Sequence, residues 1–255
     1  MRIVLQNCFF SYHNGGAVVP VFKDISLVLD PFAAAENPVL ILGPSGSGKT
    51  TLLKLMAGLL GPETDRGSAE ASPAGVITAL PGSFVFQESR LIPWLSVLEN
   101  VCLPLKRTMG RADGEERARH FLELVSLSGK TGVFPNELSG GEQRRVSVAR
   151  AFAYPAPVIY MDEPFQSMDI PLRLELLEMT RSLIEGEGRL AVVVTHDPRE
   201  AVFLGRRIIV LGKNAAGVVF DERVDLSPEE RAFGTEAQSR LEARLLPALR
   251  IMSLP

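Results

Sequence analysis

The sequence predicts an α/β protein with a mostly parallel central sheet. From residue 139 onward, short apolar runs alternate with stretches of helical spacing, and repeated strand and helix units build a parallel sheet covered on both faces. The glycine-rich segment 43–50 supports this fold class, because it lies between a strand-like run and a helix-like run. The alternating pattern of residues 2–30 predicts antiparallel strands before the parallel sheet.

The first part of the chain is expected to hold this antiparallel unit and the first strand, loop and helix of the central sheet. Residues 61–82 are rich in Gly, Pro, Ala and Ser and predict a loop with at most short edge strands. The elements expected here are strands over 8–12 and 18–29 joined by a turn at Gly15-Gly16, a strand over 39–42, a helix over 50–60 and a strand over 83–86.

Residues 88–138 have a helical texture, which predicts a helical subdomain inserted into the core. Ser96 with Glu99 has the spacing of a capping box, and Asp113 followed by Glu116 offers a second helix start. The elements expected after it are helices over 140–153, 171–185 and 198–204 and strands over 158–161, 190–195 and 207–211.

The 255 residues are interpreted as one domain, in which 1–87 and 139–212 form the core. The remaining segment, 213–255, is expected to be a tail packed on that core. Its leucines at 241, 245, 246 and 249 have the spacing of one amphipathic helix.

Composition excludes several classes of protein. The formal net charge is −3 and the basic residues are spread along the chain, so nucleic acid is not expected as a partner. Cys8 and Cys102 are too few and too far apart for a disulfide framework, which favours a reducing compartment. The longest apolar runs, such as 39–42 and 190–194, are far short of the ~20 residues of a membrane span. We therefore expect a cytoplasmic protein with at most a peripheral membrane role.

A phosphate-binding loop is predicted between the strand over 39–42 and the helix that follows it. Glycines let backbone N–H groups point at phosphates, and the helix N-terminus adds roughly half a positive charge. Lys49 should reach the β- and γ-phosphates and Thr50 should hold Mg²⁺, whereas the alternative is a glycine-rich turn with an exposed lysine. The loop residues are Gly43, Pro44, Ser45, Gly46, Ser47, Gly48, Lys49 and Thr50, with Thr51 next to them.

Two adjacent carboxylates follow the apolar strand over 158–161. Ligands of open parallel sheets gather at the carboxyl ends of strands, so Asp162 can bind Mg²⁺ while Glu163 accepts a proton from an attacking water. The alternative is a solvated pair that caps the next helix. Gln87 and His196 also stand at strand ends, although a single Gln or His is more often structural.

Residues Ser139, Gly140, Gly141 and Glu142 have two compatible interpretations. Ser followed three positions later by Glu is a capping box, and two glycines leave the helix N-terminus sterically open. Such an end can bind an anion through a hydroxyl, backbone N–H groups and the helix dipole. A second phosphate-binding surface in one domain suggests a nucleotide held between two copies.

The order of these motifs resembles the nucleotide-binding subunit of ATP-binding cassette (ABC) transporters, over nearly the whole chain. The resemblance implies a P-loop ATPase that uses ATP and Mg²⁺ and works as a dimer. Residues 43–50 resemble the Walker A loop, residues 158–162 the Walker B strand, and residues 138–142 the family signature. It further implies these roles: Glu163 as catalytic base, Gln87 as the residue that senses Mg²⁺ and water, His196 as the γ-phosphate contact, Asp169 in the interface loop, and Tyr12 stacked on adenine.

The chain departs from the family pattern at the interface loop. Residues 166–169 read Gln-Ser-Met-Asp, where the family often has Ser-Ala-Leu-Asp, so Gln166 is expected to alter contacts across the dimer. The adenine contact is open between Tyr12 and its neighbours Phe9 and Phe10, and an aromatic on a strand face is the simpler alternative.

Residues 87–95 resemble importers of nitrate, sulfonate, taurine or thiamine precursors. The resemblance implies membrane-spanning permease subunits, a solute-binding protein and a site at the cytoplasmic face of the membrane. Trp94 either docks on a permease helix or packs inside the helical subdomain. The alternatives to an importer are an exporter subunit, a soluble non-transport ATPase and a kinase, and the transported substrate cannot be read from the sequence.

Overall fold

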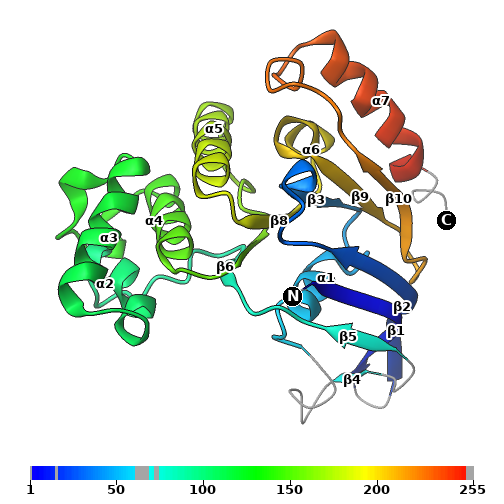
Figure 1. The fold of residues 1–255 in the computed structure, drawn as a ribbon, viewed down its shortest axis with the longest axis horizontal. Helices are drawn as coiled ribbons and strands as arrows, with labels where there is room; N and C mark the ends of the chain where they lie inside the picture. Colours follow the sequence, from blue (N-terminus) through cyan, green and yellow to red (C-terminus); the bar gives the residue numbers. More distant parts are fainter. Residues whose placement is uncertain (1, 15–16, 61–68, 72–74, 251–255) are drawn as a thin grey trace.

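The computed structural model of the chain describes residues 2–14, 17–60, 69–71 and 75–250, so the predicted turn at Gly15-Gly16 lies outside the described residues. Figure 1 shows two sheets at one end and a group of helices at the other. The antiparallel sheet contains β1 (Ile3–Asn14), β2 (Ala17–Leu29), β4 (Ala69–Ala71) and β5 (Val76–Thr78), and all three partners pair antiparallel with β1. The expected antiparallel start of the chain and the short edge strands are confirmed.

The central sheet has six strands in the order β10-β9-β3-β8-β7-β6. Only β10 pairs antiparallel among the described strands of this sheet, and the other neighbours pair in parallel. Their bounds are β3 (Val39–Leu42), β6 (Ser83–Val85), β7 (Val158–Asp162), β8 (Leu190–Thr195), β9 (Arg207–Leu211) and β10 (Val218–Arg223). The sheet is therefore mostly parallel, as the sequence predicts.

Alternate residues of the central strands face two different hydrophobic clusters. Leu40 and Leu42 point to the cluster that includes α4 (Gly140–Ala153), α5 (Ile170–Glu187) and α6 (Pro198–Leu204). Val39 and Ile41 point to the cluster that includes α1 (Lys49–Met56) and the antiparallel sheet. Every residue of β3, β7 and β8 is buried, because both faces of the sheet are covered.

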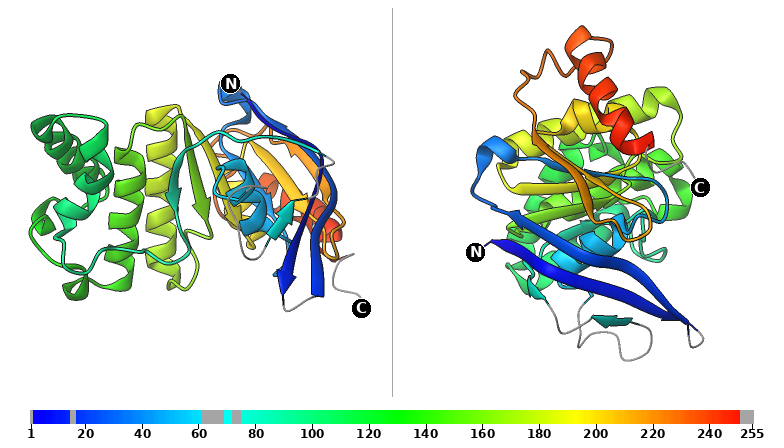
Figure 2. Two further views of the ribbon diagram at one scale, coloured as in Figure 1. Left: turned by 90° about the horizontal axis from the view of Figure 1, so that it is seen from below. Right: turned by 90° about the vertical axis from the view of Figure 1, so that its right-hand side faces the viewer.

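The helical part lies at the far end of the molecule from the antiparallel sheet, as both Figure 1 and the left view of Figure 2 show. It contains α2 (Val97–Cys102) and α3 (Arg111–Leu124), which pack on α4 (Gly140–Ala153). The capping box of Ser96 and Glu99 is confirmed at the start of α2. The predicted start at Asp113 is wrong, because α3 begins two residues earlier, after Gly110 in extended conformation. These sheets and helices together confirm the predicted fold class.

Two helix predictions need further correction. Helix α1 ends at Met56 instead of residue 60, because the backbone turns to a φ of +70° at Gly58, which a helix does not continue through. The predicted amphipathic helix is present as α7 (Glu236–Arg250), in which Leu241 and Leu245 are buried and Leu249 packs on the core, but Leu246 is 41% exposed and does not face the body. No helix within the described ranges has the length and apolarity to cross a membrane.

Candidate functional site

Four neighbouring parallel strands, β3, β8, β7 and β6, end at the same edge of the sheet, and each is followed by predicted site residues. The glycine loop follows β3, Gln87 follows β6, and His196 follows β8. Asp162 ends β7 and Glu163 comes next. Residues that are far apart in the chain therefore meet because parallel strands place their carboxyl ends together.

The glycine loop is shaped by close contacts and by left-handed backbone. Gly48 has a φ of +90°, and a Cβ at this position would lie 2.6 Å from Val21 Cγ1 and 2.7 Å from Phe22 Cζ. A Cβ at Gly43 would lie 2.5 Å from Ser47 Oγ. The Ser47 hydroxyl is buried and has no hydrogen-bond partner among the described residues. The loop thus keeps open a cradle that holds an unpaired polar group, which fits a phosphate.

Lys49 is buried at the start of α1, with its ammonium group directed back over the loop. Its Nζ donates to the carbonyl oxygens of Gly43 (2.9 Å) and Pro44 (3.1 Å) and lies 3.6 Å from Glu163 Oε1. Burial lowers the pKa of Lys49, and the nearby Glu163 carboxylate opposes this shift. The alternative of an exposed lysine on a turn is wrong.

Thr50 and Asp162 form the next contact of the site. The Thr50 hydroxyl donates to Asp162 Oδ1 at 3.0 Å, across 112 positions in sequence. Burial raises the pKa of Asp162, and the Thr50 hydrogen bond opposes it. A hydroxyl and a buried carboxylate side by side are oxygen ligands of the kind that Mg²⁺ prefers.

Glu163 lies between a lysine and a histidine. Its Oε1 faces Lys49, and its Oε2 lies 3.1 Å from His196 Nδ1. The residue has a φ of +44°, which is uncommon for a residue with a side chain. Its N–H donates to the Val194 carbonyl at 3.0 Å, which ties the turn after β7 to β8. Such a backbone outlier beside a lysine and a histidine points to a functional site.

Tyr12 lies beside the start of α1. Its hydroxyl is 3.2 Å from Thr51 Oγ1, and its ring packs edge-on against Phe10 at 5.1 Å between centroids. Phe10 is buried, with 1% of its surface exposed, whereas Phe9 is 37% exposed. Tyr12 therefore contacts Thr51, the residue next to the glycine loop, whereas Phe10 belongs to the core.

A second polar surface surrounds the start of α4. Ser139 caps this helix: its hydroxyl accepts from the N–H of Glu142 at 3.3 Å, and the Glu142 carboxylate accepts from the N–H of Ser139 at 2.9 Å. Lys130 pairs with the same Glu142 carboxylate and lowers its pKa. The capping box is confirmed. Gly140 and Gly141 have no side chains, so they leave the backbone of the first helical turn open.

This surface opens into a cavity of about 530 Å³ between the start of α4 and the interface loop. Its lining brings Gln87 and Asp169 together with the predicted signature residues. Gln87 Nε2 donates to Gln166 Oε1, so the predicted sensor and the unusual residue of the interface loop are direct partners. The remaining lining residues are Glu88, Ser89, Ser139, Gly140, Gly141, Gln143, Arg144, Ser167, Met168 and Leu172.

The two polar surfaces are separate within one chain. Helices α1 and α4 lie apart in Figure 1 and in the left view of Figure 2. Among the described residues, no hydrogen bond joins Ser139 to the glycine loop. Arg144 is not singled out by the sequence as a functional residue. Its guanidinium contacts the carbonyl group of Phe86, which precedes Gln87, and the carbonyl group of Glu163. No sequence signal separates it from Arg145, because only packing decides which arginine faces inward.

Comparisons with known proteins identify a matching family and similar chains. The protein-family model described as ABC transporter matches residues 24–166. The aliphatic sulfonates import ATP-binding protein SsuB 2 of Rhodococcus jostii (strain RHA1) is 40% identical over 211 residues, which cover 83% of this chain and 81% of that protein. The taurine import ATP-binding protein TauB of Pseudomonas entomophila (strain L48) is 38% identical over 226 residues, covering 88% and 85%.

Two solved structures are also similar. The dimeric bacterial ABC transporter cassette MJ0796 matches with a TM-score of 0.72 and 32% identity, over 88% of this chain and 100% of that chain. A dimeric post-hydrolysis state of MJ0796 bound to ADP and Pi matches with a TM-score of 0.70 and 30% identity, over 89% and 100%.

Proposed function

The chain belongs to the ABC transporter family as its ATP-hydrolysing, ATP-binding subunit, and from this premise we propose that it drives import of a small sulfonate such as taurine through a separate permease. The observation that carries the catalytic part is the convergence of Lys49, Glu163 and His196 at one sheet edge. The import direction and the solute class rest on the relatives that are import proteins for sulfonates and taurine.

Glu163 is proposed as the general base. Its carboxylate is held at one oxygen by Lys49 and at the other by His196, so an attacking water can be aligned beside it. His196 orients the carboxylate and contacts the γ-phosphate, while Lys49 and the N–H groups of the glycine loop stabilise negative charge on the transferred phosphoryl group. Tyr12 is proposed to stack on the adenine.

Thr50, Asp162 and Gln87 are proposed to hold Mg²⁺. The residues fit the ion, since the carboxylate of Asp162 lies next to the Thr50 hydroxyl and burial raises its pKa, a cost that a bound cation would offset. When bound, Mg²⁺ would neutralise charge on the β- and γ-phosphates of ATP.

A homodimer is proposed to complete each site. Ser139, Gly140 and Gly141 form an open helix N-terminus that lies apart from the glycine loop of its own chain, so they suit a nucleotide bound by a second copy. Asp169 lies in the same cavity and is proposed to contact the partner.

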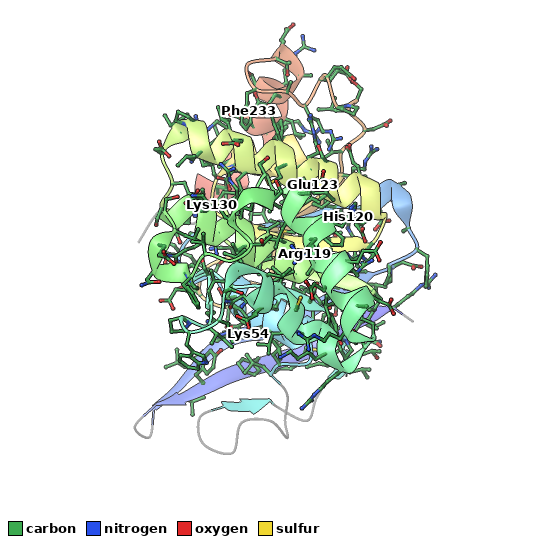
Figure 3. The ribbon with its side chains drawn as sticks, turned by 90° about the vertical axis from the view of Figure 1, so that its left-hand side faces the viewer. Lys54, Arg119, His120, Glu123, Lys130 and Phe233 are labelled. Atoms are coloured by element: carbon green, nitrogen blue, oxygen red, sulfur yellow. The ribbon has the colours of Figure 1, made fainter. Side chains whose placement is uncertain are left out.

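The variant Glu163→Gln tests the catalytic proposal. We expect kcat for ATP hydrolysis to fall by at least about 10²-fold while ATP binding persists, because the amide cannot accept the proton. ATP should also hold this variant as a dimer, measurable by size-exclusion chromatography with light scattering. Glu123→Gln is the control, since Glu123 is an exposed carboxylate on α3, seen in Figure 3. Normal turnover by Glu163→Gln would remove Glu163 from the mechanism.

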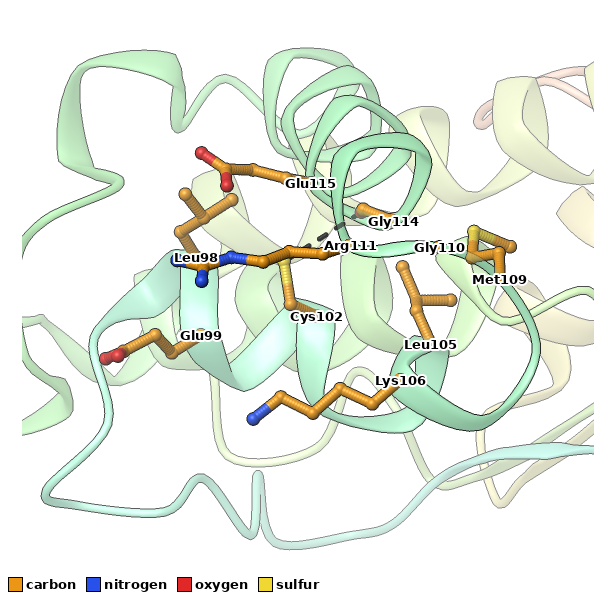
Figure 4. Close-up of a pocket in the computed structure, with 10 residues that line it drawn as sticks. All are labelled: Leu98, Glu99, Cys102, Leu105, Lys106, Met109, Gly110, Arg111, Gly114 and Glu115. Atoms are coloured by element: carbon orange, nitrogen blue, oxygen red, sulfur yellow. Dashed lines mark hydrogen bonds between the residues drawn. The ribbon is translucent and has the colours of Figure 1, made fainter.

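The permease is proposed to dock on the helical part, at the cytoplasmic face of the membrane. Trp94 is 75% exposed, so the alternative that it packs inside the helical part is wrong. A cavity of about 500 Å³ lies between α2 and α3, and its lining includes the apolar side chains of Leu98, Cys102 and Met109 (Figure 4). Charged side chains, Glu99 and Lys106 among them, surround it, which suits a short amphipathic helix of a membrane subunit.

Substitution of the exposed tryptophan tests this docking. We expect Trp94→Ala to retain ATP binding but to lose most of the permease that co-purifies with the wild-type chain. Phe32→Ala is a matched control, because Phe32 is an aromatic residue that is 83% exposed. Equal recovery of the permease with both variants would contradict the docking surface.

The solute is tested by transport in cells. Deletion of the gene should abolish uptake of radiolabelled taurine, and the wild-type gene, but not the Glu163→Gln variant, should restore it. The ligand bound to the associated solute-binding protein identifies the solute directly. If taurine uptake persists after deletion and that protein binds no sulfonate, the proposed solute class is wrong.

A further inference from the structure

Arg144 joins the helix of the family signature to the backbone of the catalytic edge. Its side chain lies inside the molecule, with 5% of its surface exposed. Nε donates to the carbonyl oxygen of Pro164 at 2.6 Å, Nη2 donates to that of Glu163 at 2.8 Å, and Nη1 donates to that of Phe86. One guanidinium thus holds two segments that carry predicted catalytic residues.

Two of the three carbonyl groups that Arg144 contacts, those of Glu163 and Phe86, belong to the backbone that positions predicted catalytic residues. Glu163 has a φ of +44°, and its N–H is held by Val194, so Arg144 fixes the other side of the same residue. Phe86 immediately precedes Gln87, so its carbonyl sets where the chain leaves β6. The planar fork of arginine suits this task, since its N–H groups point in fixed directions at several acceptors.

The proposed nucleotide contact, Ser139, lies at the start of the helix that carries Arg144. Ser139 caps α4, and Arg144 lies on the same helix in its second turn. A helix of this length is stiff, so the position of Ser139 and the position of the guanidinium are linked. Contact of Ser139 with a nucleotide on the partner would therefore affect the position of the Glu163 backbone.

We propose that Arg144 is a positioning residue for ATP hydrolysis, which aligns the main chain of Glu163 and of the segment before Gln87 with the signature helix. The inference rests on the proposed role of Glu163 as the base. Arg144 does not touch the reacting atoms, and its effect passes through the backbone that it holds.

Arg150 provides a matched control on the same helix. Its Nη1 donates to the Arg90 carbonyl and its Nη2 to the Ser89 carbonyl, both at 2.9 Å. Burial lowers the pKa of Arg150, as it lowers that of Arg144, to about 10 in the latter. The two arginines share the helix and the type of acceptor, although Arg150 is half-buried where Arg144 is buried, and only Arg144 holds Glu163.

The experiment compares Arg144→Met with Arg150→Met in the full chain. A misalignment of about 1 Å can cost about 10²-fold in rate, so we expect Arg144→Met to lower kcat by about 10²-fold while the Kd for ATP changes less than about twofold. Arg150→Met should keep kcat within about threefold. Hydrogen exchange, measured without added nucleotide, should speed up at the Glu163 amide in Arg144→Met and not in Arg150→Met.

A lysine series covers the case in which Arg144→Met does not fold, as judged by thermal unfolding. Lysine keeps the charge but concentrates its donors at one point, so Arg144→Lys should lose about tenfold in kcat, and Arg150→Lys should stay near wild type. Equal kcat values in the Arg144 and Arg150 variants, or unchanged exchange at Glu163, would overturn the inference.

The parallel Glu163→Gln variant separates this inference from the proposed function. If Glu163→Gln is inactive but Arg144→Met and Arg144→Lys hydrolyse ATP normally, only the role of Arg144 fails. If Glu163→Gln retains turnover, the proposed base fails, whatever the arginine variants do.

Discussion

His196 Nδ1 lies 3.1 Å from Glu163 Oε2, and the two residues follow the neighbouring parallel strands β8 and β7. The pair is 33 positions apart in sequence, so only the sheet brings it together. His196 is more exposed than Glu163, with 55% and 16% of the side-chain surface accessible, which places the ring on the open side of the carboxylate. A ligand can therefore reach the histidine first.

Removal of the imidazole should slow hydrolysis more than it weakens ATP binding. We expect His196→Ala to lower kcat by about 10²-fold, because the Glu163 carboxylate loses the group that orients one of its oxygens. Steady-state ATPase assays and ATP titration measure the two effects. His120→Ala is the control, since His120 is exposed on α3 (Figure 3). A similar loss in both variants would contradict a specific role for His196.

Gln166 should modulate the Mg²⁺ dependence of the enzyme. Gln87 donates to Gln166 through its amide nitrogen, and we expect this contact to compete with a side-chain position in which the amide oxygen reaches an ion beside Asp162. A net hydrogen bond is worth about 1 kcal/mol, so Gln166→Ser should lower the Mg²⁺ concentration for half-maximal ATPase by up to about fivefold. Gln166→Glu, which can still accept from Gln87, is the comparison. An unchanged Mg²⁺ requirement in Gln166→Ser would show that the contact does not compete with the ion.

The sequence predicted those parts of the fold that are encoded locally. The helix over 198–204 was predicted at both ends, because Asp197 accepts from the N–H of Arg199 and Pro198 occupies the first helical position. Strand β10 was not predicted. It lies at the sheet edge with residues alternately half-buried and exposed, and its pairing depends on β9 rather than on a local apolar run.

The candidate site likewise has parts that the local sequence predicts and parts that depend on long-range packing. The glycine loop and the Ser139 cap are short motifs whose geometry follows from neighbouring residues, so their sequence predicts them. The contacts of Arg144 with Phe86 and Glu163 link segments 58 and 19 positions away, and those of Gln87 with Gln166 span 79. Such contacts depend on the packing of the whole domain, which one sequence does not reveal.

A negative charge at Gly141 should block hydrolysis without unfolding the chain. A Cβ at this position would meet Leu172 Cδ1 and Met168 Cε at 3.5 Å, which is ordinary contact. In the proposed dimer, Gly141→Asp would, however, place a carboxylate against the phosphates of a nucleotide on the partner, and apposed like charges cost several kcal/mol. We expect ATPase activity to fall at least about tenfold, together with ATP-dependent dimerisation.

Two variants control for size and for added charge in this test. Gly141→Ala adds the Cβ without the charge and should retain most of the activity. Gly129→Asp adds the same charge at an exposed position where a Cβ meets nothing within 4 Å. If Gly141→Asp dimerises with ATP as the wild type does, the start of α4 is not the surface that meets the partner's nucleotide.

Glu200 should make the folded state less stable as the pH rises. The side chain is buried in α6, where it accepts from the Thr195 hydroxyl and lies 3.8 Å from Arg173 Nη1. Burial raises the pKa of Glu200 above the ordinary value of 4.5, and the Thr195 hydrogen bond opposes this. The folded protein therefore binds this proton more tightly than the unfolded chain does.

The sign of the pH effect follows from proton linkage. Between the unfolded pKa near 4.5 and the higher folded pKa, the folded state carries more protons, so the contribution of Glu200 to the free energy of unfolding falls as the pH rises through this window. Glu200→Gln removes the titration. The stability of the variant relative to the wild type should therefore increase from pH 4.5 upward and become constant above the folded pKa, as measured by urea unfolding at a series of pH values. Glu123→Gln on the exposed face of α3 is the control. A stability difference between Glu200→Gln and wild type that is flat with pH, or that falls as the pH rises, would mean that the buried carboxyl does not hold its proton more tightly in the folded chain.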